Sequence, residues 1–118
     1  MAIARRDTPP ENLGTEIARI LDEVGLLPHT ASSLPAELSG GMCQRAALAI
    51  AIAPSPRLVI ADEPETGLDP VLRRVVIQLL VRVCTQNNAG LLLISHHEDT
   101  VERIADHVVR LRISGKAA

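Results

Sequence analysis

Two short aliphatic runs restrict the fold of this chain more than any other feature. Residues 58–61 (LVIA) and 91–94 (LLLI) are continuous apolar stretches bounded by proline, glycine or polar residues. Uninterrupted runs of this length are typical of parallel strands that are covered on both faces. Between them, residues 70–83 repeat apolar side chains at helical spacing and place arginine and glutamine on the other face. We therefore predict an α/β domain in which this helix packs on a parallel sheet.

Local start and stop signals predict the remaining elements. Thr8, Pro9, Pro10 and Glu11 resemble a capping box with prolines in the first turn, so a helix is expected to begin there. Asp69 before Pro70 is typical of an N-cap at the start of the central helix. The other expected elements are a loop over residues 28–35, helices over residues 41–53 and 97–106, and a last, partly exposed strand over residues 108–113. The predicted order is ααβαβαβ.

The composition excludes several classes of function. Phenylalanine, tyrosine and tryptophan are all absent although 47% of the residues are apolar, so the core has to be aliphatic. With a net charge of −2 and no aromatic residue for base stacking, we expect no nucleic-acid partner. No apolar segment is long enough for a membrane span, so direct membrane insertion is not expected. Cys43 and Cys84 have no close cysteine partner and are predicted to be reduced, buried thiols, which is typical of cytosolic proteins.

Polar residues follow both aliphatic runs. Asp62 and Glu63 come after the first run, and Ser95, His96 and His97 come after the second. Ligands of open α/β sheets bind at the carboxyl ends of the strands. Two adjacent carboxylates there suit a nucleotide hydrolase, because one can hold Mg²⁺ and its waters while the other orients or deprotonates the attacking water. A histidine on the neighbouring strand could contact the γ-phosphate.

Each of these features also has a simpler interpretation. The Asp-Glu-Pro sequence can be a solvated turn, and Gly40-Gly41 can be a hinge between a loop and a helix. The run His96, His97, Glu98 and Asp99 suggests a metal cluster, but adjacent residues of an extended chain point to opposite sides. His29 and His107 have no such neighbours and are expected on the surface. The combination of features and their order along the chain favours the functional interpretation.

The order of motifs resembles the ATP-binding subunits of ABC transporters. LSGGMCQR at 38–45 is similar to the signature motif of that family, LVIADE at 58–63 to its Walker B strand, GLDP at 67–70 to its D-loop, and ISH at 94–96 to its H-loop. Met42 after the two glycines, together with IADEP and IADHVVRL, resembles the dipeptide, oligopeptide and nickel importer branch. The implied fold is a partial P-loop NTPase domain. Residues 8–53 would form a helical subdomain, and residues 57–113 would form the C-terminal part of the parallel-sheet core.

The resemblance also implies a role for each motif residue. Asp62 would hold Mg²⁺ through water, Glu63 would be the general base, and His96 would contact the γ-phosphate of ATP. Ser39, Gly40, Gly41 and Gln44 would contact the ATP held by a second ABC ATPase subunit in a head-to-tail dimer. Asp69 would help to link the two shared sites. A serine hydroxyl, glycine amides and a helix N-terminus together suit an anion.

The same resemblance implies where such a chain acts and with which proteins. Its partners would be the second ATPase subunit and transmembrane permease subunits, with the chain lying peripherally on the cytoplasmic face of the cell membrane. The implied function is hydrolysis of ATP to energise the uptake of peptides, nickel or a similar small solute. A non-hydrolytic interaction module that pairs with a complete ATPase is the alternative. A soluble ABC-type ATPase of DNA repair or translation is disfavoured by Met42 and by the lack of basic surface.

The chain departs from the family pattern at three points. The phosphate-binding motif G-x-x-x-x-G-K-[ST] does not occur in these 118 residues, so we expect a C-terminal part of the domain that cannot hold ATP alone. Glu65 stands where Thr usually follows Asp-Glu-Pro, and His97 stands where Asp commonly follows the H-loop histidine. The charge of Glu65 should weaken a site for a polyanion unless its side chain points away.

Overall fold

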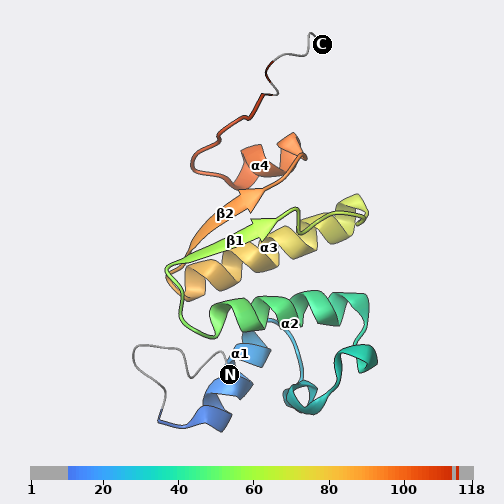
Figure 1. The fold of residues 1–118 in the computed structure, drawn as a ribbon, viewed down its shortest axis with the longest axis vertical. Helices are drawn as coiled ribbons and strands as arrows, with labels where there is room; N and C mark the ends of the chain where they lie inside the picture. The colour runs from blue at the N-terminus through green and yellow to red at the C-terminus, as the bar shows by residue number, and fades with distance from the viewer. Residues whose placement is uncertain (1–10, 113, 115–118) are drawn as a thin grey trace.

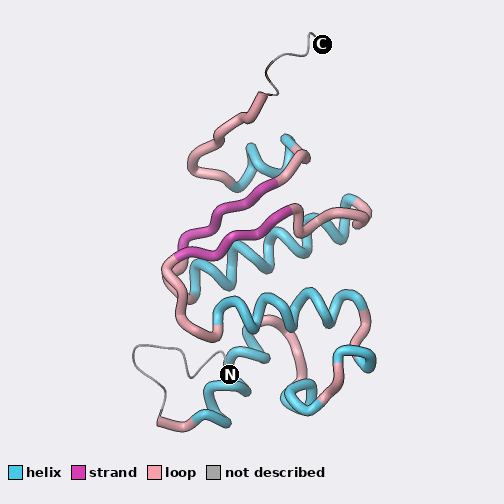
Figure 2. The backbone as a smooth tube through the Cα atoms, viewed as in Figure 1, coloured by secondary structure: helices cyan, strands magenta, loops and turns pink. Residues whose placement is uncertain are grey.

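The computed structural model describes residues 11–112 and 114. The elements are α1 (Leu13–Glu23), the 3-10 helices η2 (Pro28–Ser32) and η3 (Pro35–Glu37), α2 (Gly40–Ile52), β1 (Leu58–Asp62), α3 (Pro70–Gln86), β2 (Gly90–Ile94) and α4 (Glu98–Ile104). Figure 1 shows α1 and α2 below the sheet and α4 beyond the end of β2. The backbone trace in Figure 2 shows the same order of helices and strands.

The two strands form a parallel sheet, as the aliphatic runs predict. Leu58 lies opposite Gly90 at one end, and Asp62 lies opposite Ile94 at the other. The helix α3 connects the strands and packs against β2, so β1, α3 and β2 form one crossover unit. The carboxyl ends of both strands therefore meet at one edge of the sheet.

The core is aliphatic and lies between the helices and one face of the sheet. Val24 and Val83 are fully buried, and Ile52 and Ile77 are almost fully buried. These side chains come from α2, α3 and the residue that ends α1. Burying an aliphatic side chain of this size contributes about 1.5 to 3 kcal/mol, so packing in this cluster holds the helices to the sheet.

The expectation that both strands are covered on both faces is wrong. Val59 and Ala61 are buried, but Leu58 is 53% exposed and Ile60 is 61% exposed. Leu92 of β2 is also half exposed. Successive side chains of a strand point to opposite faces, and here only the face toward the helices is covered. A continuous apolar run indicates that both faces avoid water, but not that this chain supplies both covers.

Cys43, which lies in α2, is less buried than expected. Cys43 is exposed, and only Cys84 is a buried thiol. Ile50 is 66% exposed, so α2 buries one face and presents an apolar residue to solvent. Burial raises the pKa of the Cys84 thiol.

Three predicted segments differ in the structure. Residues 107–112 form no strand because, within the described chain, no neighbouring strand pairs with them; Ile113 lies outside the described residues. The helix α1 begins at Leu13, where the Asn12 side chain accepts a hydrogen bond from the Thr15 amide at 3.0 Å. The capping box at residues 8–11 falls mostly outside the described residues. The expected loop over residues 28–35 contains a 3-10 helix that proline starts.

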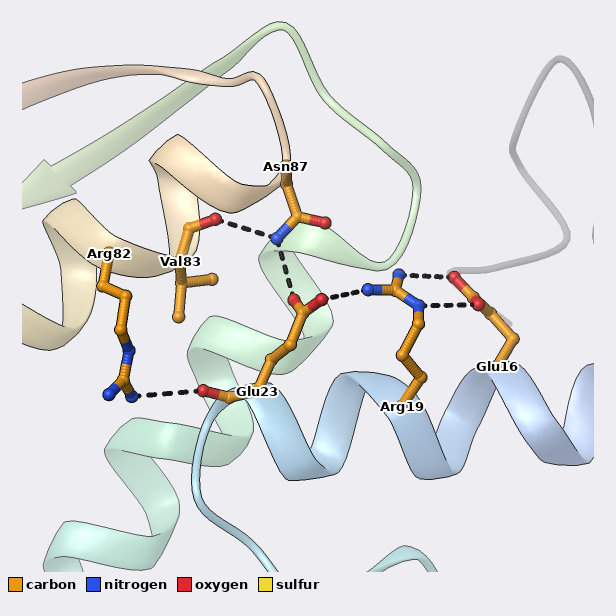
Figure 3. A network of polar contacts seen from close by, with 6 residues as sticks. All are labelled: Glu16, Arg19, Glu23, Arg82, Val83 and Asn87. Atoms are coloured by element: carbon orange, nitrogen blue, oxygen red, sulfur yellow. Dashed lines mark hydrogen bonds and ion pairs between the residues drawn. The ribbon is translucent and has the colours of Figure 1, made fainter.

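A polar network ties α1 to the end of α3 (Figure 3). The side-chain amide of Asn87 donates hydrogen bonds from Nδ2 to Glu23 Oε2 at 2.9 Å and to the Val83 carbonyl at 2.8 Å. Arg19 also contacts the Glu23 carboxylate, and Arg82 donates to the Glu23 carbonyl at 3.4 Å. Glu23 therefore holds the end of one helix against the end of another that is distant in sequence.

Candidate functional site

The predicted strand-end residues meet at the carboxyl edge of the sheet. Asp62 is the last residue of β1 and is exposed. The amide of Glu63 donates a hydrogen bond to the Ile94 carbonyl at 2.8 Å, which extends the pairing beyond the strand. This bond places Glu63 beside the segment that follows β2, where Ser95 and His96 lie.

Glu63 and His96 form a contact across this edge. His96 Nδ1 lies 3.2 Å from Glu63 Oε1, and the Thr66 hydroxyl donates to Glu63 Oε2 at 3.3 Å. The hydrogen bond with His96 lowers the pKa of Glu63 and outweighs the opposing effect of desolvation. Glu63 is therefore ionised at neutral pH. Both side chains are well exposed, so a water molecule can reach the carboxylate.

The backbone at Glu63 is unusual. Its φ angle is 46°, in the left-handed region that residues other than glycine seldom adopt. The turn after it is held by hydrogen bonds from the Thr66 amide to the Glu63 carbonyl and from the Leu68 amide to the Glu65 carbonyl, each 3.2 Å long. A conformation of this kind persists where its surroundings fix it, as they often do at functional sites.

Asp69 begins α3 as its N-cap, which confirms the local prediction. Its Oδ1 atom accepts hydrogen bonds from the amides of Val71 at 2.9 Å and Leu72 at 3.0 Å. Pro70 occupies the first helical turn, where its missing amide proton costs nothing. Asp69, in the segment that resembles the D-loop, therefore stabilises the start of α3 within this chain.

The signature segment forms the start of α2. Ser39 is the N-cap, and its hydroxyl accepts a hydrogen bond from the Met42 amide at 3.2 Å. Gly40 and Gly41 are the first helical residues, and a Cβ atom added to either would meet no described atom within 4 Å. Gln44 lies one turn further on and is exposed. Both glycines are exposed, and no packing contact in the described chain requires glycine at these positions.

One open groove connects the signature segment (residues 38–45) with the strand edge, which comprises the carboxyl ends of the two strands and the residues that follow them (62–66 and 95–97). Its volume is about 690 Å³, and its lining includes Gly40, Gly41 and Gln44 on one side and Glu63 and Thr66 on the other. The remainder of the lining is mostly apolar and comes from α2, β1 and α3. Asp62, Asp69 and His96 do not line it. The structure therefore brings Gly40, Gly41, Gln44 and Glu63 together in one groove. Asp62 and His96 lie outside it at the carboxyl ends of the strands, and Ser39 and Asp69, which cap α2 and α3, do not line it either.

The metal-cluster interpretation of the histidine run finds no support in the geometry. The rings of His96 and His97 lie 4.2 Å apart and are tilted by 36°. His97 Nδ1 lies 3.1 Å from the Arg73 guanidinium, a cation that disfavours a metal ion there. Residues 11–112 and 114 contain no group of three or more potential metal ligands. Asp62 presents an exposed carboxylate, a donor type that suits Mg²⁺ when water and phosphate oxygens supply the other ligands.

Sequence reasoning missed the contacts of Glu65. This side chain is only 1% exposed, and the Ser95 hydroxyl donates a hydrogen bond to its Oε1 atom. Glu65 therefore points into the protein, away from the groove. A local pattern could not indicate this, because glutamate is usually exposed and Ser95 is far away in the sequence.

Comparison with known proteins identifies the family to which this chain belongs. The sequence profile described as ABC transporter matches residues 3–66, more than half of the chain. The chain belongs to the ABC transporter family of ATP-binding proteins, which confirms the resemblance of its motifs. Its fold is a partial nucleotide-binding domain of that family with a small parallel sheet.

Particular relatives narrow the comparison. The chain is 39% identical to the oligopeptide transport ATP-binding protein OppD of Lactococcus lactis subsp. cremoris, over 90% of its own length and 32% of that protein. It is 38% identical to the methionine import ATP-binding protein MetN 1 of Pseudomonas fluorescens, over 82% of its own length and 29% of that protein. The chain thus spans about a third of the length of these relatives.

A solved structure supports the same fold. The ATP-binding cassette MJ0796, determined as a dimer in a post-hydrolysis state with ADP and phosphate bound, superposes with a TM-score of 0.63 at 25% identity. The match covers 84% of this chain and 44% of that chain. In the described part of the present chain, no helix combines the length and apolar character needed to cross a membrane.

Proposed function

We propose that this chain supplies the segment from the signature motif to the H-loop of an ATP-hydrolysing importer subunit. The observation that carries the proposal is the Glu63–His96 contact at the carboxyl edge of the sheet. It joins an ionised, accessible carboxylate to a histidine in the segment that follows β2. The ATP would be held by a phosphate-binding loop that these 118 residues do not contain.

Each residue at the strand edge has a distinct role in this proposal. Glu63 accepts a proton from the attacking water, and its lowered pKa keeps it in the form that can do so. His96 contacts the γ-phosphate while its other ring nitrogen stays against Glu63. Asp62 would hold Mg²⁺ through water, and the ion would supply positive charge against the phosphates. The reaction is phosphoryl transfer to water, in which positioning and electrostatics contribute most of the rate.

The signature segment acts on a second subunit. Ser39, Gly40, Gly41 and Gln44 face the nucleotide held by the partner in a head-to-tail dimer. The open space around both glycines supports this role, because a phosphate can approach bare amides at a helix N-terminus. Asp69 links the two shared sites while it caps α3.

The remainder of the nucleotide-binding domain would cover the outer face of the sheet. Leu58, Ile60, Leu92 and Ile94 are between 46% and 61% exposed on that face, and apolar residues of this density need a cover. Residues 8–53 would form the helical subdomain and residues 57–113 the core. The assembly would lie against permease subunits at the cytoplasmic face of the membrane.

The transported solute is a small peptide, an amino acid, nickel or a similar small solute. The relatives OppD and MetN 1 are named for oligopeptide transport and methionine import, which supports the first two.

The test is reconstitution with a polypeptide that carries the phosphate-binding loop. We expect the mixture to hydrolyse ATP in a Mg²⁺-dependent manner, and Glu63→Gln to reduce the rate by at least about a hundredfold. The matched control is Glu11→Gln, an exposed acid before α1, which should keep full activity. Undiminished hydrolysis by Glu63→Gln would refute the assignment of the base. The chain alone should show no saturable ATP binding by calorimetry.

A non-hydrolytic interaction module is the second candidate. It is favoured by the open space around Gly40 and Gly41, which suits contact with an anion held by another protein. Such a module would bind an ATP-loaded ATPase without raising its turnover, and Ser39→Arg would abolish the binding. Turnover that rises on mixing and depends on Glu63 would exclude it.

A further inference from the structure

Glu65 is an acidic side chain in an unusual place. Among the described residues it is the fully buried acid, with 1% of its surface exposed. It lies in the turn between Glu63 and Asp69, yet its side chain crosses to the segment that follows β2. Acids are rarely buried without a partner that compensates for the loss of water.

The hydrogen-bond partner of Glu65 is Ser95, whose hydroxyl connects the Glu65 carboxylate to the backbone of His97. The Ser95 hydroxyl donates to Glu65 Oε1 and accepts a hydrogen bond from the His97 amide at 3.0 Å. The series of hydrogen bonds therefore runs from the turn after β1 to the backbone on both sides of His96. Within the described residues Glu65 Oε2 has no hydrogen-bond partner. A buried polar atom left in this state calls for an explanation other than stability.

A second tie holds the same two segments together. Arg73 donates from Nε to the Leu68 carbonyl at 3.2 Å, and its Nη1 lies 3.1 Å from His97 Nδ1. Ser95 and His97 are thus each fixed to the turn that begins with Glu63. His96 lies between them, exposed and hydrogen-bonded to Glu63.

We propose that Glu65 is a positioning residue that holds His96 against Glu63 through Ser95. Glu65 touches neither a reacting atom nor the groove; it fixes the backbone from which His96 projects. The consequence for ATP hydrolysis rests on the proposed function, whereas the effect on the Glu63–His96 hydrogen bond does not.

The direct test is histidine NMR on the full chain. Glu65→Ala should move the ring resonances of His96 and His97 and remove the nuclear Overhauser effect between His96 and Glu63. Two histidines, His29 and His107, serve as internal references and should not shift. Ser95→Ala, which deletes the relaying hydroxyl alone, should reproduce the change. Glu65→Gln keeps the acceptor at Oε1 and should restore the Overhauser effect.

Several outcomes overturn the proposal. An intact His96–Glu63 Overhauser effect in Glu65→Ala would show that Glu65 only fills space. If Glu65→Ala shifts all four histidines, as unfolding would, then Ser95→Ala decides: an unchanged Overhauser effect in that variant refutes the proposal. The control Asp106→Ala removes an exposed acid and should leave His96 against Glu63.

Hydrolysis by the reconstituted assembly tests the consequence separately. Glu65→Ala should lower kcat by about tenfold with little change in KM for ATP, because positioning acts on the reacting geometry rather than on binding. Glu65→Gln should recover most of the rate. If NMR shows that His96 separates from Glu63 as expected, but the unmodified assembly does not hydrolyse ATP, the positioning role stands and the proposed function fails. An unchanged kcat in a Glu65→Ala variant whose His96 has separated from Glu63 would refute the role in the reaction.

Discussion

The two parts of the candidate site are built in opposite ways. At the strand edge, Glu63 contacts His96 and Thr66, and Glu65 contacts Ser95, so the side chains are fixed by one another. At the start of α2, the only described side-chain bond of Ser39 caps its own helix, and Gly40 and Gly41 have empty space where a side chain would stand. The side chains of the strand edge are therefore fixed by contacts within the chain, whereas the glycines of the signature segment have no side-chain neighbour in the described structure.

This difference indicates what each part needs from outside. The carboxylate of Glu63 and the ring of His96 are already hydrogen-bonded to each other, so they hold their positions without a further partner. Open amides at a helix N-terminus gain an interaction only when an anion approaches. Substitutions at the strand edge should therefore affect the isolated chain and the assembly, whereas substitutions of Gly40 and Gly41 should affect the assembly alone.

The largest expected effect separates these two cases. Gly41→Val places a branched side chain where the nucleotide of a second subunit would lie, so hydrolysis by the reconstituted assembly should fall by about a hundredfold or more. In the isolated chain the new side chain meets no described atom within 4 Å. The free energy of unfolding should therefore change by less than about 1 kcal/mol, measured by urea denaturation. A large decrease in stability with normal hydrolysis would show that Gly41 serves the fold of this chain and not contact with a second subunit.

The next effect concerns Asp69, whose carboxylate is likewise fixed by hydrogen bonds within the chain. Asp69→Ala removes an acceptor that caps two amides of α3, so the free energy of unfolding should fall by about 1 to 2 kcal/mol. Asp69→Asn is the matched control, because asparagine is an equally good N-cap. An unchanged denaturation midpoint in Asp69→Ala would mean that the cap contributes nothing to stability.

An effect of similar size is expected where α1 meets α3. Asn87→Ala removes the amide that joins Glu23 to Val83, and each hydrogen bond removed is worth about 1 kcal/mol. Thermal unfolding should show the decrease, while Gln86→Ala, an exposed neighbour at the end of α3, should not. If both variants unfold alike, the network in Figure 3 does not hold the helices together.

Local sequence signals predicted a large part of the fold. The apolar runs indicated both strands and their parallel class, and Asp69 with Pro70 indicated the start of α3. These features depend on residues that are close in sequence. The open face of the sheet could not be predicted, because apolar strands look the same whether or not the chain itself supplies the second cover.

The candidate site was predicted less completely, because part of it depends on contacts between segments that are distant in sequence. The motif order located the strand edge and the signature segment, but the burial of Glu65 depends on Ser95, which no local pattern connects to it. The strand expected over residues 108–113 failed because a strand needs a neighbour, and none pairs with residues 107–112 in the described structure. Interactions between segments that are distant in sequence are the features that local patterns do not predict.

The smallest expected effect is a pH dependence at the strand edge. The hydrogen bond with His96 lowers the pKa of Glu63 relative to its unfolded value, so the folded state binds fewer protons than the unfolded state. The stabilisation is therefore present above the unfolded pKa, about 4.3 for glutamate, and disappears as the pH falls through the lower folded value.

His96→Gln removes the largest cause of this shift. The titration midpoint of the Glu63 carboxyl carbon, followed by NMR, should rise toward the ordinary value in His96→Gln and stay low in His107→Gln. The same change should move the acid limb of ATP hydrolysis upward in the assembly, because a protonated Glu63 cannot accept a proton from water. A midpoint that is equal in both variants would show that the strand edge is no more preorganised than the signature segment.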